Sequence, residues 1–153
     1  LLLACLLFIK RIMETTEITA IKEEIHVEDE AGIMHDESIT IPAGVEVYEI
    51  NGPYFFGVAT QFEELMSEFR DKSKVRVIRM RKVPFIDSTG IHNLSNFCEM
   101  SYKNKIMVVL SGVNPQVHGA LEKAGFYDLV GEKNICPNIN VALSRAEEIM
   151  KGE

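Results

Sequence analysis

The chain has 153 residues, and 46% of them are apolar, which is enough for one domain with a hydrophobic core. Its 16 basic and 23 acidic residues give a net charge of −7, so a nucleic acid is not an expected partner. The three cysteines, Cys5, Cys98 and Cys136, are odd in number and lack metal-ligand spacing, which argues against a disulfide framework or a bound metal and favours a reducing compartment.

The N-terminal end is strongly apolar, because Leu1 to Ile9 form an unbroken apolar run that Lys10 and Arg11 follow. Nine residues of helix rise only about 14 Å, against a bilayer core of about 30 Å, so this run alone is too short to span a membrane. A signal peptide has its charges before the apolar run, which is the reverse of this order. Two interpretations stay open: a buried helix of a soluble domain, and the cytoplasmic end of a truncated transmembrane helix over residues 1–13.

Residues 14–42 are expected to connect this end to the main domain. Ile18, Ile21 and Ile25 recur at helical spacing, which predicts a short helix between Met13 and His26. Seven acidic residues and no Lys or Arg follow between Glu23 and Glu37, a composition typical of a solvated linker.

Strands and amphipathic helices alternate through the rest of the chain, which predicts an α/β fold. A turn at Pro42 to Gly44 separates a short strand, 38–41, from the first strand of the main domain. The expected strands are 45–50, 75–80 and 106–110, and the expected helices are 58–69, one that begins at Asp87, 115–124 and 139–150. A hairpin-like segment around 45–56 predicts a mixed sheet rather than an all-parallel one.

The turn after the strand 75–80 is the first candidate site, because ligands meet an open α/β sheet at the carboxyl ends of its strands. Asp87 is placed to cap the following helix, and Ile86 and Ile91 are placed to form a hydrophobic staple across that cap. Ser88 then lies in the first helical turn, where unpaired amides and the helix dipole would accept a phosphate. Gly90 would let another backbone approach closely.

Three basic residues precede this turn: Arg79, Arg81 and Lys82. They are candidates to pair with Asp87 or with a phosphate on Ser88. The plainer alternatives are a solvated strand face for the basic residues and an ordinary helix cap for the turn.

Catalysis and metal binding are not expected at the turn. His92 could approach Ser88, but a Ser-His pair needs a third orienting group and an oxyanion site, and the spacing indicates neither. A small α/β enzyme using Ser88 or His92 is therefore the least favoured interpretation.

Three stretches together resemble a known family, the STAS domain. They are Val-Pro-Phe-Ile-Asp-Ser-Thr-Gly-Ile at 83–91, the run Gly44 to Phe56, and Leu-Glu-Lys-Ala-Gly-Phe at 121–126. STAS domains occur in anti-sigma-factor antagonists and at the cytoplasmic end of SulP-type anion transporters. The resemblance covers residues 43 to 150, and the Gly-Pro-Tyr-Phe-Phe run at 52–56 resembles the transporter branch.

The resemblance implies an α/β STAS-like mixed β-sheet flanked by amphipathic helices. It implies a non-catalytic regulatory and interaction domain at 43–153, on the cytoplasmic side of an inner-membrane SulP-type transporter of sulfate-like anions. Residues 1–13 would then end the last transmembrane helix. By the same resemblance, Ser88 matches the residue that is phosphorylated in the antagonist branch, and Asp87, Thr89 and Gly90 match its surroundings.

The partners implied are the transmembrane domain of the same polypeptide and a kinase or carrier protein at the Asp-Ser-Thr-Gly turn. A homodimer of the full transporter is also compatible with the resemblance. No cofactor is expected, although nucleotide binding near the turn stays open. The alternative function is a free-standing anti-sigma-factor antagonist that switches partners when Ser88 is phosphorylated.

Overall fold

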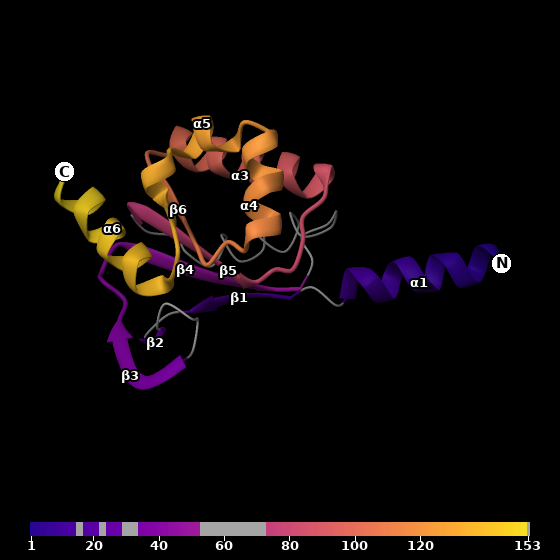
Figure 1. Ribbon diagram of the computed structural model, residues 1–153, viewed down its shortest axis with the longest axis horizontal. Coiled ribbons are helices and arrows are strands. Elements are labelled where there is room, and N and C mark those ends of the chain that lie inside the picture. The colour runs from indigo at the N-terminus through magenta and orange to yellow at the C-terminus, as the bar shows by residue number, and fades with distance from the viewer. Residues whose placement is uncertain (15–16, 22–23, 29–33, 53–72, 153) are drawn as a thin grey trace.

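The computed structural model describes residues 1–14, 17–21, 24–28, 34–52 and 73–152. Its centre is a five-stranded sheet with the strand order β1-β4-β5-β6-β7 (Figure 1). The strands are β1 (Glu17–Ile21), β4 (Val45–Asn51), β5 (Val75–Lys82), β6 (Met107–Ser111) and β7 (Ile135–Cys136). Strands β4 to β7 run parallel, whereas β1 pairs antiparallel with β4 along the edge of the sheet.

Helices cover both faces of this sheet. On one face lie α3 (Ser88–Lys103), α4 (Pro115–Lys123) and α5 (Phe126–Val130), and on the other lies α6 (Ile139–Lys151) (Figure 1). A 3-10 turn, η1 (Glu132–Asn134), precedes β7. The mixed α/β sheet flanked by amphipathic helices is therefore confirmed.

Alternate residues of β5 point to opposite faces of the sheet, as the period of a strand requires. Ile78 and Met80 belong to the core under α3, and Val75 and Val77 belong to the core under α6. Because both faces are covered, the strand is buried from Val75 to Met80. This alternation decides which polar residues of β5 can reach the turn after it.

The chain before residue 43 differs from the expectation. The helix predicted between Met13 and His26 is wrong, because the structure has β1 there and begins β2 (Glu24–Glu28) within the same range. Ile18 is buried and Ala20 packs against the same core, so this segment follows a two-residue period that the helical spacing of its isoleucines concealed. The sheet thus recruits a strand from outside the expected domain.

The acidic stretch is not simply a linker. Strand β2 pairs antiparallel with β3 (Met34–Thr40) in a separate two-stranded sheet, and the segment predicted as a strand at 38–41 forms the end of β3. Ile39 and Ile41 pack against the core under α6. The predicted helix 58–69 and the continuation of the hairpin at 54–56 lie outside the described residues, and the antiparallel pairing that makes the sheet mixed comes from β1.

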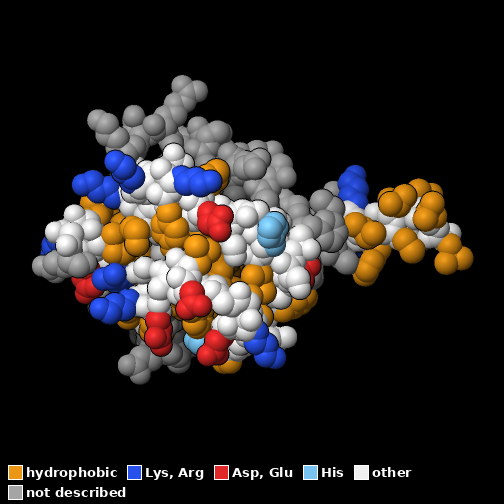
Figure 2. Space-filling model, turned by 90° about the horizontal axis from the view of Figure 1, so that it is seen from above, with side chains coloured by type: hydrophobic (Ala, Val, Ile, Leu, Met, Phe, Trp, Pro, Cys, Tyr) orange, Lys and Arg blue, Asp and Glu red, His pale blue; other side chains and the backbone are white. Residues whose placement is uncertain are grey.

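Helix α1 (Leu2–Glu14) extends away from the sheet (Figure 1). Residues 1 to 11 are all exposed, including Leu2 at 78% and Phe8 at 65%, so the alternative of a buried helix does not describe this arrangement. Figure 2 shows hydrophobic side chains over most of its surface. None of the helices in the described ranges has the length and apolar character needed to cross a bilayer.

Candidate functional site

The Asp-Ser-Thr-Gly turn, residues 87–90, forms the beginning of α3 as predicted. Asp87 is the N-cap in an extended conformation, and its Oδ1 accepts a hydrogen bond of 2.6 Å from the amide of Gly90. The carbonyl of Asp87 accepts the first helical bond, 2.9 Å, from the amide of Ile91. Ser88 and Thr89 are exposed, whereas Gly90 is buried. The turn therefore offers two hydroxyl side chains to solvent from a firmly capped helix.

Hydrophobic contacts hold the turn from below. Ile86 is buried and Ile91 packs against the same core cluster, which agrees with the predicted staple across the cap. Phe85, directly before them, is instead 39% exposed. An exposed phenylalanine beside two exposed hydroxyl groups gives this turn an apolar as well as a polar contact group.

Asn114 also supports the turn, in a role that sequence reasoning missed. Its Oδ1 caps α4 by accepting from the amide of Val117 at 2.8 Å. Its Nδ2 donates to the carbonyls of Val83 at 2.7 Å and Pro84 at 3.2 Å, in the segment that leads to the turn. One side chain thus fixes the start of α4 against the approach to α3. An asparagine followed by a proline is a local signal for a helix cap, whereas the contact with Val83 and Pro84 depends on the fold.

The basic residues before the turn lie elsewhere than expected. Their ion pairs are with Glu49 of β4, at 3.6 Å for Arg79, 3.6 Å for Arg81 and 3.5 Å for Lys82. Within the described part of the chain, Asp87 forms no ion pair. The prediction that these residues pair with Asp87 is therefore wrong.

The physical reason is the alternation along β5. Arg79 has the same parity as Val75 and Val77, so it lies on the face of the sheet under α6, while α3 covers the opposite face. Glu49 lies on that same face of the neighbouring strand, directly beside Arg79 in the register. Arg79 and Arg81 are therefore on the face opposite α3 and Ser88, whereas Lys82 has the other parity and its exposed side chain reaches Glu49 at the end of the strand.

The turn and α1 lie at the same end of the strands, the end at which β4 and β5 finish and β1 begins. Asn51, at the end of β4, pairs with Glu17 at the start of β1 and with Lys82 at the end of β5. Helix α1 ends at Glu14, three positions before β1 begins. The exposed apolar helix and the exposed hydroxyls of the turn thus share one edge of the domain.

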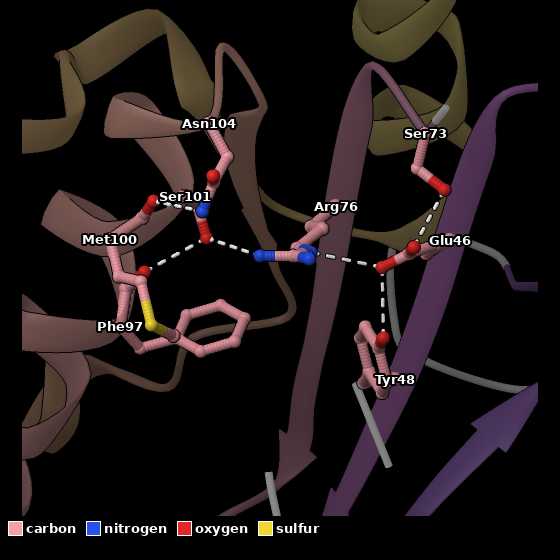
Figure 3. A network of polar contacts seen from close by, with 8 residues as sticks. All are labelled: Glu46, Tyr48, Ser73, Arg76, Phe97, Met100, Ser101 and Asn104. Atoms are coloured by element: carbon pink, nitrogen blue, oxygen red, sulfur yellow. Dashed lines mark hydrogen bonds and ion pairs between the residues drawn. The ribbon is translucent and has the colours of Figure 1, made fainter. Parts of the chain in front are cut away.

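A buried polar network occupies the other end of the β4–β5 pair (Figure 3). Arg76 donates from Nε to Oε2 of Glu46 at 2.9 Å and from Nη1 to Oγ of Ser101 at 2.8 Å. Glu46 also accepts from the hydroxyls of Tyr48 at 2.8 Å and Ser73 at 2.6 Å. The network ties β4 and β5 to the last turns of α3. Sequence patterns do not reveal it, because Arg76 is far along the chain from both Glu46 and Ser101.

Neither a catalytic pair nor a metal site forms around the turn. The imidazole Nε2 of His92 lies 3.3 Å from Nδ2 of Asn96, one turn further along α3, and no hydrogen bond joins His92 to Ser88. The described residues contain no group of three or more histidine, cysteine or acidic side chains that could hold a metal.

Comparison with known proteins identifies this arrangement. The sequence model of the STAS domain matches residues 38–142. The chain belongs to the STAS domain family. The crystal structure of a sulfate transporter family protein from Wolinella succinogenes is 41% identical, with a TM-score of 0.69, and the match covers 74% of this chain and 93% of that one.

The SulP transporter STAS domain from Vibrio cholerae is 37% identical, with a TM-score of 0.66 over 74% of this chain and 89% of that chain. These two structures show that the chain is a STAS domain of the SulP transporter type. YvdB of Bacillus subtilis, a protein named provisionally as a sulfate transporter, is 26% identical over 135 residues. The match covers 88% of this chain but only 24% of YvdB, so the chain spans about a quarter of that relative.

The likeness to the antagonist branch is one of fold alone. The anti-sigma factor antagonist SpoIIAA in its unphosphorylated form is 13% identical, with a TM-score of 0.58 over 72% of this chain and 94% of that one. STAS domains of both kinds are in general non-enzymatic.

Proposed function

We propose that this chain is the cytoplasmic regulatory and interaction domain of a SulP-type secondary transporter of sulfate-like anions, with no catalysis of its own. In this proposal α1 continues a transmembrane helix, and the domain biases a conformational equilibrium of the membrane part through contacts that differ between its states. The Asp-Ser-Thr-Gly turn is the point of contact and control.

The exposed hydroxyl of Ser88 at the start of α3 is the observation that carries this proposal. A phosphate on Ser88 would meet the positive end of the helix dipole, so the fold could accept it without rearrangement. The same phosphate would add close to two negative charges beside Asp87. A partner that docks on Phe85, Ser88 and Thr89 would then meet a changed surface.

The position of α1 supports a site near the membrane. Because α1 and the turn share one edge of the sheet, a helix that entered the bilayer would bring the turn close to the membrane part of the protein. The exposed apolar residues of α1 are costly in water and favourable in lipid or against another apolar helix. A kinase or carrier protein that reached Ser88 would do so at this edge, and a transporter dimer would bring two such edges together.

The test is anion uptake by the full polypeptide that carries this chain. We expect Ser88→Asp and Ser88→Ala to change the rate of labelled sulfate uptake in opposite directions, by about twofold or more, at equal protein level. The matched control is Ser144→Asp, which adds the same charge to an exposed serine of α6. Phosphopeptide analysis of the protein from its host should find phosphate on Ser88. Unchanged uptake in both Ser88 variants, with Ser88 always unmodified, would reject the role of this serine.

The second candidate is a free-standing anti-sigma-factor antagonist, favoured by the position of Ser88 and by the fold shared with SpoIIAA. That role gives no use to the exposed apolar helix α1. Fractionation of host cells decides between the two: a transporter domain stays with the membrane after high-salt washing, and an antagonist stays in the soluble fraction. Recovery of the native polypeptide only in the soluble fraction would overturn the transporter proposal.

A further inference from the structure

An apolar cavity lies at the opposite end of the strands from the Asp-Ser-Thr-Gly turn. It has a volume of about 480 Å³ and is lined by residues from the end of α3, the start of β6 and α5: Tyr102, Lys105, Ile106, Met107, Leu129 and Val130. Because β5 and β6 run parallel, the start of β6 and the end of β5 lie at opposite edges. The volume is within the range of small-molecule sites, about 300–1,000 Å³. The proposed control point at Ser88 does not account for this cavity.

One polar group in the wall of the cavity lacks a hydrogen-bond partner. The Tyr102 hydroxyl is buried and has no hydrogen-bond partner among the described residues. Burial, with the neighbouring Cys98 thiol, raises the pKa of Tyr102 far above its ordinary value. A buried hydroxyl without a partner is unfavourable, so a ligand group that hydrogen-bonds to the Tyr102 hydroxyl would be stabilised here.

Lys105 adds a positive charge to the lining. Its backbone has φ of +60°, and it is the one non-glycine residue of the described chain with a positive φ. This conformation ends α3 in a Schellman motif, in which the amides of Lys105 and Ile106 donate to the carbonyls of Tyr102 at 2.9 Å and Ser101 at 2.8 Å. The ammonium group is exposed and forms no ion pair within the described ranges. An unpaired cation thus borders a cavity whose other walls are apolar or aromatic.

We propose that this cavity binds a small amphipathic carboxylate, such as a medium-chain fatty acid. The alkyl chain lies against Ile106, Met107 and Leu129, and the carboxylate pairs with Lys105. An apolar lining with a few placed polar groups is the usual form of a ligand site, and a carboxylate is the natural counter-charge for a lysine. The site is independent of Ser88 and of any phosphate there.

The test is an NMR titration of the isotope-labelled chain with sodium octanoate below its micelle concentration. We expect saturable amide shifts at Ile106, Met107 and Leu129. Hexanoate should bind about fifteenfold more weakly, since it has two fewer methylenes and each buried methylene contributes about a fourfold change in affinity. Octanol should bind more weakly than octanoate, because it lacks the charge that Lys105 would pair with.

Matched lysine variants separate the site from general charge. Lys105→Ala should weaken octanoate binding by about threefold, in the range of an exposed ion pair, whereas Lys103→Ala should leave it unchanged, because Lys103 is exposed on α3 but does not line the cavity. Leu129→Trp, which fills the cavity, should abolish binding while circular dichroism remains native. Both lysines lie on the surface, so their variants keep the test valid even if Leu129→Trp unfolds.

The opposite results are equally clear. Shifts that never saturate, or that centre on the exposed apolar residues of α1, would mean detergent-like association and would overturn the proposal. Equal binding by the Lys105→Ala and Lys103→Ala variants, with octanol as tight as octanoate, would overturn the role of the carboxylate.

Discussion

The charged side chains at the two ends of the β4–β5 pair differ in how closely they are hydrogen-bonded. At the start of the strands, Glu46 and Arg76 are both less than 8% exposed and share direct hydrogen bonds with the hydroxyls around them. At the other end, Glu49 faces Arg79, Arg81 and Lys82 at 3.5–3.6 Å, beyond good hydrogen-bond distance. The first end is a closed clamp, and the second is a looser cluster that reaches solvent.

This difference indicates which end of α3 is held by buried polar contacts and which end is exposed. The clamp reaches the last turns of α3 through Ser101, which also donates to the carbonyl of Phe97 at 2.8 Å. The Arg76 guanidinium lies 5.6 Å from the centre of the Phe97 ring, a further favourable contact. The far end of α3 is thereby anchored, while its beginning, with Ser88, stands exposed at the edge that carries the looser charges.

Breaking the clamp should have the largest effect. Arg76→Met keeps most of the side-chain volume but leaves the Glu46 carboxylate buried without its cation, which typically costs about 3–5 kcal/mol. We expect a loss of that size in the free energy of unfolding, measured by urea denaturation at pH 7. The double variant Glu46→Leu with Arg76→Met should recover part of the loss, because it removes the buried charge. A loss below about 1 kcal/mol in the single variant would contradict the clamp.

Thiol labelling compares the two ends of the β4–β5 pair under conditions in which the protein stays folded. Burial raises the pKa of the Cys98 thiol on α3 to about 12, so at pH 8 the native protein should label quickly at the exposed Cys5 and slowly at Cys98. Because the pKa in the folded state lies above the ordinary value of 9.0, this thiol also lowers stability as pH rises from about 9 towards 12. Arg76→Met should speed the labelling of Cys98 more than a change at Glu49 does.

Opening the looser cluster should cost less. Glu49→Gln removes the shared counter-charge of three cations. The Arg79 side chain is only 3% exposed, but Lys82 is 51% exposed and Arg81 is 22% exposed, so water can take over part of the interaction. We expect a loss of about 2 kcal/mol by urea denaturation, and a smaller difference from the native protein at 1 M salt. A loss as large as that of Arg76→Met would remove the contrast between the two ends.

The helix cap should matter less again. Asp87→Ala removes the acceptor for the amide of Gly90, and such caps typically contribute about 1 kcal/mol. Asp87→Asn is the control, because its side-chain oxygen can still accept that bond and should retain most of the stability. Equal losses in the two variants, measured by thermal unfolding, would show that the charge rather than the cap holds the turn.

The smallest effect is expected at Ser88 itself. Ser88→Asp adds an exposed negative charge at the start of α3, where the dipole favours it and Asp87 opposes it, so stability should change by less than about 0.5 kcal/mol. Thermal unfolding measures this directly. A loss of 2 kcal/mol would mean that the turn cannot carry the added charge of a phosphate, and the proposed control point would lose its physical basis.

Local signals explain what the sequence predicts well. Asp87, Asn114 and Asn138 each cap a helix through a side-chain oxygen, and a cap of this kind depends only on residues within one turn of it. Long-range pairing explains what it predicts badly. Glu46 and Arg76 are 30 positions apart, and only the register of β4 on β5 places them together. The error over Arg79 was avoidable, because its parity with Val77 was already present in the sequence.

The attachment of α1 has a mechanical consequence. The helix leads into β1, whose five residues lie antiparallel against β4, so tension on the helix would act along the strand. A load in that direction strains the rungs of the β1–β4 ladder together in shear, instead of peeling them apart one at a time. The β1–β4 ladder would therefore pass a displacement of α1 along its axis to β4, and through β4 to the parallel strands.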